Sequence, residues 1–533
     1  MTNPELCFLT AAELGSLIVK REISPVEIIE AMLTRIEMLN ESLRAYLYIN
    51  ADRSMTEART AEREICKGAY RGPLHGIPVA YKDIYHVRGL PTTAGSKIMA
   101  DYIAMEDCTV AAKLRSAGAI CLGKLNTLEF ASGSMEVFGD TRNPWNTQMV
   151  TGGSSSGSAT ALSAHLTTLA TGTDTGGSVR TPASYCGVVG FKPTYGRISR
   201  AGIIPLSWSL DHAGPMARTV EDVCLLLATM AGQDPRDPTA SLEPVSDYSA
   251  ALNNDLKNVR IGVPRSYFFE EADPDVLRAV NGAIRTMREA GADLYEIDLP
   301  HAEHGSAASW TIAYSEAFAF HRNNFLERPG DYTPAFLHKI SSAAFLTAEE
   351  RVTSQRIRQV ITSEFLQALK TVDVIATPTT SYPAYPLKGC SSQSFMRSLT
   401  RPVSLTGLPA LSVPCGFASQ GLPVSIQLIG RAWSESSVLR TAYAYEQAAG
   451  WHRRRPPICA GGSTESRSPV EYGADWVDSQ WVLDFARLTG LKFVNVRNAG
   501  SIAAYVGPVK AQLDIARKRL QESIEPPVRP APL

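Results

Sequence analysis

Residues 151–182 read TGGSSSGSATALSAHLTTLATGTDTGGSVRTP and contain two serine clusters, each preceded by a pair of glycines. The first cluster is Gly152-Gly153-Ser154-Ser155, and the second, 24 residues further on, is Gly176-Gly177-Ser178. Glycine lets the backbone approach a ligand closely and adopt positive φ angles. A serine hydroxyl can act as a nucleophile or as a proton relay. The pair of clusters therefore favours a site where backbone N–H groups and hydroxyls converge on a reacting carbonyl.

The chain has 533 residues, of which 44% are apolar and 20% charged, as is typical of globular proteins. Its length predicts one large domain or two to four smaller ones. The formal net charge of -1 gives no electrostatic reason to expect a nucleic-acid partner. There is no run of 18 apolar residues, and the start MTNPELCFLTAAEL lacks the features of a secretory signal. We therefore expect a cytoplasmic protein without integral membrane association.

The nine cysteines are scattered and form no CxxC pair, and the nine histidines show no HExxH spacing. Scattered cysteines are typical of buried free thiols in a reducing compartment. A metal site is not indicated by these spacings, and we expect neither a metal nor another cofactor.

Apolar patterning predicts strands alternating with helices. A capping box at Ser24-Pro25-Val26-Glu27 begins a helix whose apolar residues share one face. Further helices are predicted at 109–117, from Thr219 to near Gly232, from Asp273-Pro274 to Gly291, and from a Ser434 cap to Gly450. Strands are predicted at 77–80, 119–122, 293–299, 372–376, 410–413 and 424–428. This alternation favours an α/β fold with a mixed, partly parallel sheet.

The composition changes at Arg453–Pro469, where proline, glycine, serine and threonine dominate. We place a linker there, at residues 456–470, between a main domain (1–455) and a tail (471–533). The tail is predicted to contain two amphipathic stretches, at about 475–488 and 508–523, before an extended EPPVRPAPL.

The glycine–serine clusters allow three interpretations. A phosphate-binding loop is one, but the stretch has neither the GxxxxGK[ST] lysine nor GxGxxG. A tightly packed structural region is the second, and it would explain the glycines but not the serines and charges placed together. The third is a reactive site, which needs a base because a serine hydroxyl is a weak nucleophile at neutral pH.

Histidine and lysine are both candidates for that base. His165 lies between the clusters and His212 beyond them, but neither accompanies a GxSxG elbow. Lys82 follows the apolar run 76–81, whose end would project it inward, and desolvation lowers the pKa of a lysine. The apolar flank favours Lys82 as a buried base over a solvated surface charge.

These residues resemble the amidase signature family of serine hydrolases, in order and spacing, over roughly residues 5–455. The stretches that carry the resemblance are GIPVAYKDI (76–84), TGGSSSGSA (151–159), GTDTGGSVRTPASYCGVVGFKPTYGRIS (172–199), SLDHAGPMARTVED (209–222), DVIATPTT (373–380), LTGLPALSVPCG (405–416) and LPVSIQLIGRAWSE (422–435). The resemblance implies the amidase signature fold, with a large mixed β-sheet covered by helices on both faces, and here a C-terminal helical extension.

The resemblance also implies a Ser–cis-Ser–Lys triad. Ser178 corresponds to the acyl-forming nucleophile, Ser154 to the bridging serine after a cis peptide, and Lys82 to the general base. Lys82 would accept a proton through Ser154 while Ser178 attacks the amide carbonyl, and water would then hydrolyse the acyl-enzyme.

The same resemblance assigns roles to the residues around the nucleophile. The backbone N–H groups of Thr175, Gly176, Gly177 and Ser178 would form the oxyanion hole. Asp174 and Arg180 would order the loop by ion pairing, and Ser155 would support the same network. Ser156 stands where glycine is commoner in the family. Cys186 is interpreted as a packing residue.

The motifs leave the amide substrate open. Pocket residues should come from Asn126–Phe138 and later loops, so Leu128 and Phe130 are candidates for the acyl site, with a core position as the alternative. The tail loosely resembles the small C subunit of glutamyl-tRNA amidotransferase or the small companion subunits of some amidases, with a family-specific helical extension as the alternative. We expect a small-molecule amide as partner, and the sequence allows a homodimer.

Three functions compete. The first is hydrolysis of a carboxylic acid amide C–N bond through an acyl-enzyme on Ser178. The second is the glutamine-hydrolysing A subunit of a tRNA-dependent amidotransferase, which uses the same triad. The third is a non-catalytic binding subunit, against which the presence of Lys82, Ser154 and Ser178 argues.

Overall fold

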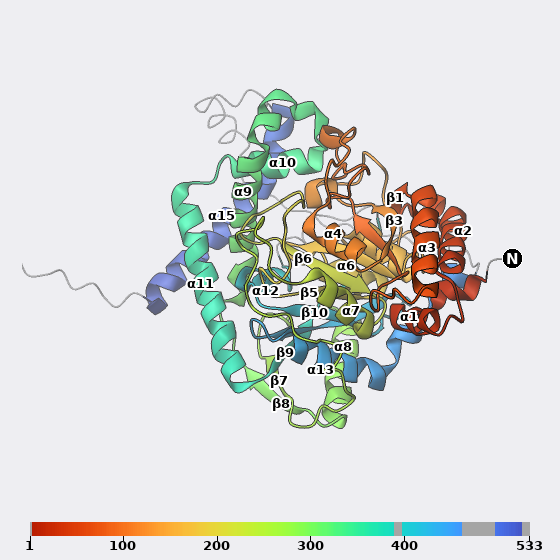
Figure 1. Cartoon of the computed structure of the whole chain (residues 1–533). Helices are drawn as coiled ribbons and strands as arrows, with labels where there is room; N and C mark the ends of the chain where they lie inside the picture. Colours follow the sequence, from red (N-terminus) through yellow and green to blue (C-terminus); the bar gives the residue numbers. More distant parts are fainter. Residues whose placement is uncertain (1–2, 388–396, 461–495, 525–533) are drawn as a thin grey trace, which may run out of the picture.

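A single mixed β-sheet forms the centre of the protein. The structure is a computed structural model that describes residues 3–387, 397–460 and 496–524. Within these residues the sheet has 11 strands in the order β1-β3-β2-β4-β6-β5-β10-β11-β9-β7-β8 (Figure 1). The strands are β1 (Tyr46–Ile49), β2 (Pro78–Lys82), β3 (Ile120–Leu125), β4 (Leu169–Asp174), β5 (Val189–Lys192), β6 (His212–Ala217), β7 (Arg260–Pro264), β8 (Asp293–Ile297), β9 (Val374–Pro378), β10 (Ala410–Phe417) and β11 (Pro423–Gly430).

The sheet combines parallel and antiparallel pairs. β2 is parallel to both β3 and β4, and β7 is parallel to both β8 and β9. The strands between these groups, β4-β6-β5-β10-β11-β9, pair antiparallel. The mixed sheet predicted from the alternation of elements is therefore confirmed, and the strand order sets the ends of β2 and β4 next to each other.

Both faces of the central strands are covered by other parts of the protein. The evidence is that every residue is buried in β2, β3, β4, β6 and β11. In Figure 1 the helices α1–α3 lie at one side of the sheet and α9–α11 at the other. The helices are α1 (Ala11–Val19), α2 (Pro25–Leu43), α3 (Ala51–Cys66), α4 (Thr109–Ser116), α5 (Ser156–Ser163), α6 (Arg180–Cys186), α7 (Val220–Met230), α8 (Pro274–Glu289), α9 (Gly305–Glu327), α10 (Pro334–Ala343), α11 (Ala348–Thr371), α12 (Arg401–Thr406), α13 (Glu435–Ala449) and α15 (Val496–Ile524).

The predicted helix starts mostly hold in detail. Ser24 and Glu27 form the capping box of α2, and the Thr219 hydroxyl accepts a hydrogen bond from the Asp222 N–H at the start of α7. Ser434 occupies the N-cap position of α13 as predicted, but its side chain makes no capping hydrogen bond. The Glu435 carboxylate instead reaches away from the helix to the Thr194 N–H and the Arg197 guanidinium.

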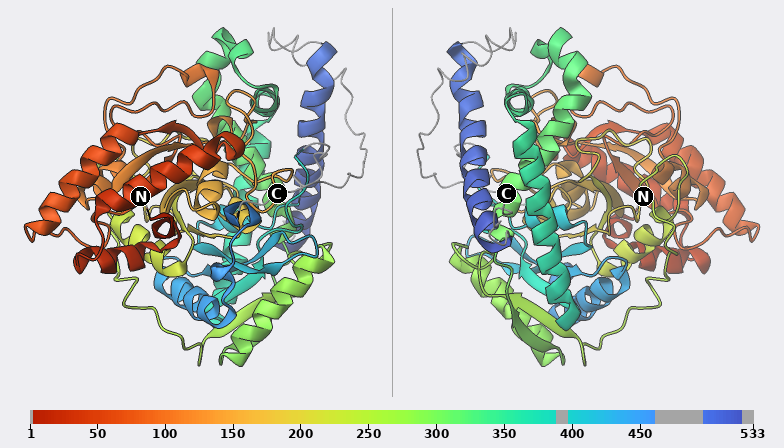
Figure 2. Two further views of the ribbon diagram at one scale, coloured as in Figure 1. Left: turned by 90° about the vertical axis from the view of Figure 1, so that its right-hand side faces the viewer. Right: turned by 90° about the vertical axis from the view of Figure 1, so that its left-hand side faces the viewer.

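The tail contributes one long helix. The predicted stretch 508–523 lies inside α15, which begins earlier, at Val496, and continues through Pro508. α15 stands beside α9, α10 and α11 in both views of Figure 2, and Val509, Leu513 and Ala516 are buried in that contact. The other predicted stretch, 475–488, and most of the predicted linker lie outside the described residues.

Candidate active site

Lys82 is the last residue of β2, and its side chain is fully buried. Its Nζ atom lies 2.7 Å from Ser154 Oγ, 2.8 Å from Thr173 Oγ1 and 3.1 Å from Ser155 Oγ. Burial lowers the pKa of Lys82 to about 7, although the more distant carboxylates of Asp211 and Asp174 act to raise it. Near neutral pH the amine is thus divided between the charged form, with three donors, and the neutral form, which can accept a proton.

Ser154 lies in a tight turn immediately before α5. The Gly153–Ser154 peptide bond is cis, and Gly152 has a positive φ of 70°. The Thr127 hydroxyl donates to the Ser154 carbonyl oxygen at 3.0 Å. Ser156, which stands where the sequence resemblance implies glycine, donates its hydroxyl to the Gly152 carbonyl oxygen at 2.7 Å. The Ser156 side chain therefore closes this turn and leaves Ser154 beside Lys82.

Ser178 lies on the loop between β4 and α6. Its carbonyl oxygen accepts a hydrogen bond from the Ser155 N–H at 3.2 Å, which ties the two serine clusters together. Gly177 has a φ of 125°, and a Cβ atom at this position would lie 2.1 Å from Thr400 Oγ1. Only glycine fits there, because the φ and the close approach both exclude a side chain.

The backbone N–H groups of this loop fall into two sets. The N–H of Gly177 donates to Asp174 Oδ1 at 2.8 Å and is therefore used within the loop. In the described part of the chain, no protein group accepts a hydrogen bond from the N–H of Thr175, Gly176 or Ser178. These three amides, rather than all four expected from the sequence, are available to a ligand oxygen.

A buried ion pair supports the loop. Asp174 and Arg180 are both fully buried, with Arg180 Nη2 2.9 Å from Asp174 Oδ1. Although burial alone would raise it, the Arg180 guanidinium holds the pKa of the Asp174 carboxyl well below its usual range. Arg180 also donates to the Gln427 and Ser404 side chains and to the Thr400 carbonyl oxygen. The pair thus joins the Ser178 loop to α12 and β11.

Ser154 and Ser178 face one large cavity of about 1210 Å³. Its wall includes Leu128, a candidate for the acyl site, together with Thr175, Gly176 and Gly177 of the loop. Phe130 is not among the lining residues. Its ring is buried and packs against His321, Tyr332 and Phe336, which corresponds to the core position weighed as its alternative.

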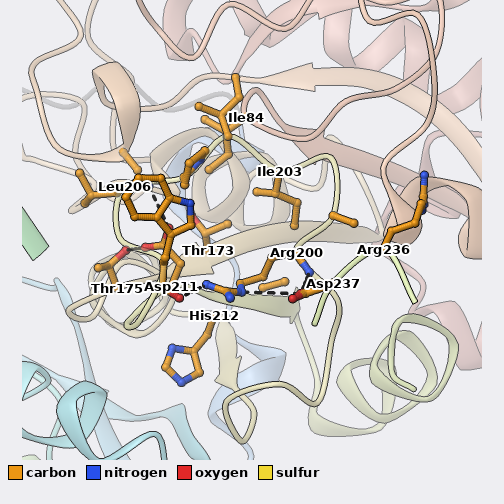
Figure 3. Close-up of a pocket in the computed structure, with 16 residues that line it drawn as sticks. Ile84, Thr173, Thr175, Arg200, Ile203, Leu206, Asp211, His212, Arg236 and Asp237 are labelled. Atoms are coloured by element: carbon orange, nitrogen blue, oxygen red, sulfur yellow. Dashed lines mark hydrogen bonds and ion pairs between the residues drawn. The ribbon is translucent and has the colours of Figure 1, made fainter. Parts of the chain in front are cut away.

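A second, smaller cavity of about 250 Å³ has Thr173 and Thr175 in its wall (Figure 3). Asp211, His212, Arg200 and Trp208 line it, and it shares Thr175, Leu206 and Ala131 with the large cavity. The Asp211 carboxylate accepts a hydrogen bond from the Thr175 hydroxyl at 2.5 Å, so the two cavities meet at the loop.

Neither histidine weighed as a base contacts the serines. His212 Nδ1 faces the carbonyl oxygens of Asp174 and Leu210, and its Nε2 lies 3.3 Å from Lys192 Nζ. His165 packs against the ring of Phe8. Burial holds the pKa of both imidazoles well below the usual value. In the part of the chain that the structure describes, no group of three His, Cys, Asp or Glu side chains could hold a metal ion, and no helix is long and apolar enough to cross a bilayer.

Several residues of the site were missed by sequence reasoning. Thr173 contacts Lys82, while Thr400, Ser404 and Gln427 contact the Ser178 loop or its ion pair. A glutamine in the apolar strand PVSIQLIG was one available signal, because a buried polar side chain requires a partner. The residues on α12 and just before it carry no such signal, since they lie more than 200 positions from Ser178.

The fold and the site together define a class of α/β protein. In this class a buried lysine, here Lys82, contacts one serine, Ser154, and a second serine that follows two glycines, Ser178, lies in the same cavity. A family model described as Amidase matches residues 27–439. The chain belongs to the amidase signature family and is an enzyme of the kind that acts on C–N bonds.

Named relatives of two kinds match the chain. The A subunit of glutamyl-tRNA(Gln) amidotransferase from Geobacter metallireducens is 40% identical over 492 residues, which cover 85% of this chain and 100% of that protein. The solved native peptide amidase of Stenotrophomonas maltophilia has a TM-score of 0.74 and 32% identity, covering 84% of this chain and 98% of that one. The solved amidotransferase A subunit from Thermotoga maritima has a TM-score of 0.71 and 31% identity, covering 84% and 96%.

Proposed function

We propose that the chain hydrolyses a carboxylic acid amide through an acyl-enzyme on Ser178, releasing a carboxylate and ammonia or an amine. The observation that carries the proposal is the contact of 2.7 Å between Lys82 Nζ and Ser154 Oγ, with burial lowering the pKa of the amine to about 7. A general base is most effective when its pKa lies near the working pH.

The acylation step begins with neutral Lys82 accepting the Ser154 hydroxyl proton. Ser154 in turn takes the proton of Ser178, whose Oγ forms a bond to the carbonyl carbon of the substrate. The carbonyl oxygen becomes an oxyanion, for which the N–H groups of Thr175, Gly176 and Ser178 are the candidate donors. The proton then returns through Ser154 to the leaving nitrogen, and the C–N bond breaks.

Deacylation repeats the relay with water as the nucleophile. Water attacks the acyl carbon, its proton passes through Ser154 to Lys82, and the C–O bond to Ser178 breaks. The proton held by Lys82 returns through Ser154 to the Ser178 oxygen, and the carboxylic acid product loses its own proton to solvent to give the carboxylate. Each residue thereby recovers its starting protonation state.

A fluorophosphonate probe tests the proposal, because it labels activated serine nucleophiles. We expect labelling of Ser178 in the full chain, and loss of both label and amide turnover in Ser178→Ala. Ser163→Ala is a suitable control, since that serine is buried at the end of α5 and makes no contact with Lys82. Retained turnover in Ser178→Ala would overturn the assignment.

The relatives favour a second candidate, the release of ammonia from glutamine for a tRNA-dependent partner. The support is the 40% identity to an amidotransferase A subunit over most of the chain. Turnover of glutamine that depends on a tRNA-binding partner would support this role. Rapid hydrolysis of other amides by the chain alone would support the first.

We also propose that the tail is an extension that stabilises the catalytic unit. We interpret residues 1–455 as the catalytic unit, 456–470 as a linker and 471–533 as the extension. The packing of α15 on α9, α10 and α11 supports this interpretation. A linker would keep the extension close to the catalytic unit, at a high effective concentration, and so favour this contact.

A further inference from the structure

Arg401 lies directly against the oxyanion loop. It is the first residue of α12 and lines the large cavity together with Gly176 and Ser178. A Cβ atom built on Gly176 would lie 3.2 Å from each of Cγ, Cζ and Nη1 of Arg401. The stem and the charged head of Arg401 therefore both cover Gly176, on the wall where the scissile carbonyl would bind.

The position of Arg401 is fixed by its neighbours. The Thr400 hydroxyl donates to the Gly176 carbonyl oxygen at 2.7 Å, and Arg180 Nη2 donates to the Thr400 carbonyl oxygen at 3.2 Å. Because Arg180 is itself held by Asp174, the start of α12 and the loop form one connected unit. The start of α12, which carries Arg401, is therefore held in place relative to Ser178.

The surroundings of Arg401 form a polar wall. Its Nη1 atom lies 3.4 Å from Ser309 Oγ, and the Tyr314 hydroxyl stands nearby, bonded to the Ser132 hydroxyl. Lys339 donates to the Ser132 carbonyl oxygen at 2.6 Å, which adds a second cation to the same side of the cavity. Burial lowers the pKa of Arg401 from its high ordinary value, against the opposing effects of Tyr314 and Asp174.

Three of the acidic side chains that line the cavity are engaged elsewhere, and the fourth, Asp140, is exposed. Glu271 pairs with Arg397 at 3.1 Å, and Asp273 caps α8 by accepting from the Asp275 N–H at 2.8 Å. Asp275 pairs with Arg278 and accepts from the Ser419 N–H. Among the charged groups of this cavity, the Arg401 guanidinium is the one that lies against Gly176 of the oxyanion loop.

We propose that Arg401 binds a carboxylate of the substrate, so that the amides hydrolysed carry a carboxylate a few bonds from the scissile carbonyl. This inference rests on the proposed function of Ser178. A guanidinium matches the planar geometry of a carboxylate and can bind it with two parallel hydrogen bonds. Because the cavity wall is partly desolvated, this interaction is stronger than it would be in bulk water.

Matched substrate pairs test the proposal on the full chain. Succinamate and 4-oxopentanamide have the same shape, but only the first carries a carboxylate on the acyl side. N-acetylglycine and N-acetylaminoacetone are the corresponding pair for the amine side. We expect kcat/KM to favour the carboxylate in at least one pair by tenfold or more, since a hydrogen bond to a charged group contributes about that factor or greater.

Variants of Arg401 test whether this residue causes the preference for the carboxylate. Arg401→Gln is expected to reduce the preference about 10- to 100-fold, and Arg401→Lys to reduce it less, because the charge remains but the planar fork is lost. Arg265→Gln is the control, since Arg265 is exposed, pairs with Glu296 and does not line the cavity. A preference of about one in both pairs, or an equal loss on both members of a pair in Arg401→Gln, would overturn the proposal.

Labelling of Ser178 provides a measurement on the unmodified chain, which does not depend on the variants folding. Succinamate and 4-oxopentanamide serve as competing ligands for the acyl side, and N-acetylglycine and N-acetylaminoacetone for the amine side. The carboxylate member of at least one pair should protect Ser178 from the fluorophosphonate at a tenfold lower concentration. Equal protection in both pairs, with Ser178 still labelled, would reject the carboxylate site while leaving the amidase assignment intact. Turnover by Ser178→Ala would reject the assignment itself.

Discussion

The rate of Ser178 acylation should follow the titration of Lys82. Burial lowers the pKa of this amine to about 7, so about half of it is neutral at pH 7, about one tenth at pH 6 and about nine tenths at pH 8. Only the neutral form can accept the proton that passes through Ser154. We therefore expect the rate to fall about tenfold per pH unit below pH 6 and to be constant above pH 8.

Thr173→Val changes this titration in a defined direction. The Thr173 hydroxyl accepts a hydrogen bond from Lys82 Nζ at 2.8 Å, and valine has nearly the same shape without the hydroxyl. A hydrogen bond from a charged donor contributes about 1.5–3 kcal/mol and one from a neutral donor about 1 kcal/mol. The loss therefore disfavours the ammonium by about 1 kcal/mol more than the amine, which lowers the midpoint by about 0.5 to 1 pH unit.

The assay is the rate of fluorophosphonate labelling from pH 5 to pH 10, measured for the wild type and Thr173→Val. Thr160→Val is a matched control, because Thr160 is also buried but donates to the Arg142 carbonyl oxygen and does not contact Lys82. A wild-type midpoint at pH 9 or above would refute the role of burial. An upward shift in Thr173→Val, or an equal shift in Thr160→Val, would refute the assignment of the midpoint to Lys82.

Thermal unfolding gives an independent measure of the same pKa. The amine titrates near pH 7 in the folded protein and near its ordinary 10.5 when unfolded, so the unfolded chain binds more protons between these values. The wild type consequently gains stability as the pH rises from 7 to 10.5. Lys82→Met lacks this term, so its Tm relative to the wild type should be highest at or below pH 7 and should decline toward pH 10.5. A difference that is constant with pH would contradict a depressed pKa.

Two further changes test the packing around the site. Asp174→Asn leaves the buried Arg180 charge without its carboxylate, so we expect a loss of about 3–5 kcal/mol in the free energy of unfolding, measured by denaturant titration. The exposed Asp298→Asn should change it little, and equal effects would argue against the ion pair. Leu513→Asp places a charge in the buried contact of α15 and should lower the Tm by several degrees. Ile515→Asp, on an exposed position of the same helix, should not, and equal melting of the two variants would contradict docking of α15.

The sequence predicted the elements that have strong local signals. The capping box of α2, the apolar strands β2 and β3, and the helices closed by Gly118 and Gly291 all depend on residues close together in the chain. The helix α15 was predicted too short, because its first turns, from Val496, have no capping signal and Pro508 marks a helix start more often than an interior position.

Some features of the site were likewise predictable from the sequence, and others were not. The contact of Lys82 with Ser154 was expected from motifs, whereas the use of the Gly177 N–H by Asp174 was not, because it depends on the rotamer of one buried carboxylate. Phe130 was weighed equally as pocket or core, and only its packing against His321 and Phe336 places it in the core.

The sequence by itself determined the family, the mixed α/β architecture and the three residues to examine, Lys82, Ser154 and Ser178. These depend on local motifs, in which glycine pairs and apolar runs restrict the backbone wherever they occur. The tertiary structure decided the pKa of the lysine, the amides left free in the loop and the position of Arg401. Desolvation and charge proximity depend on segments that meet only when β2, β4 and α12 pack together, so no local pattern encodes them.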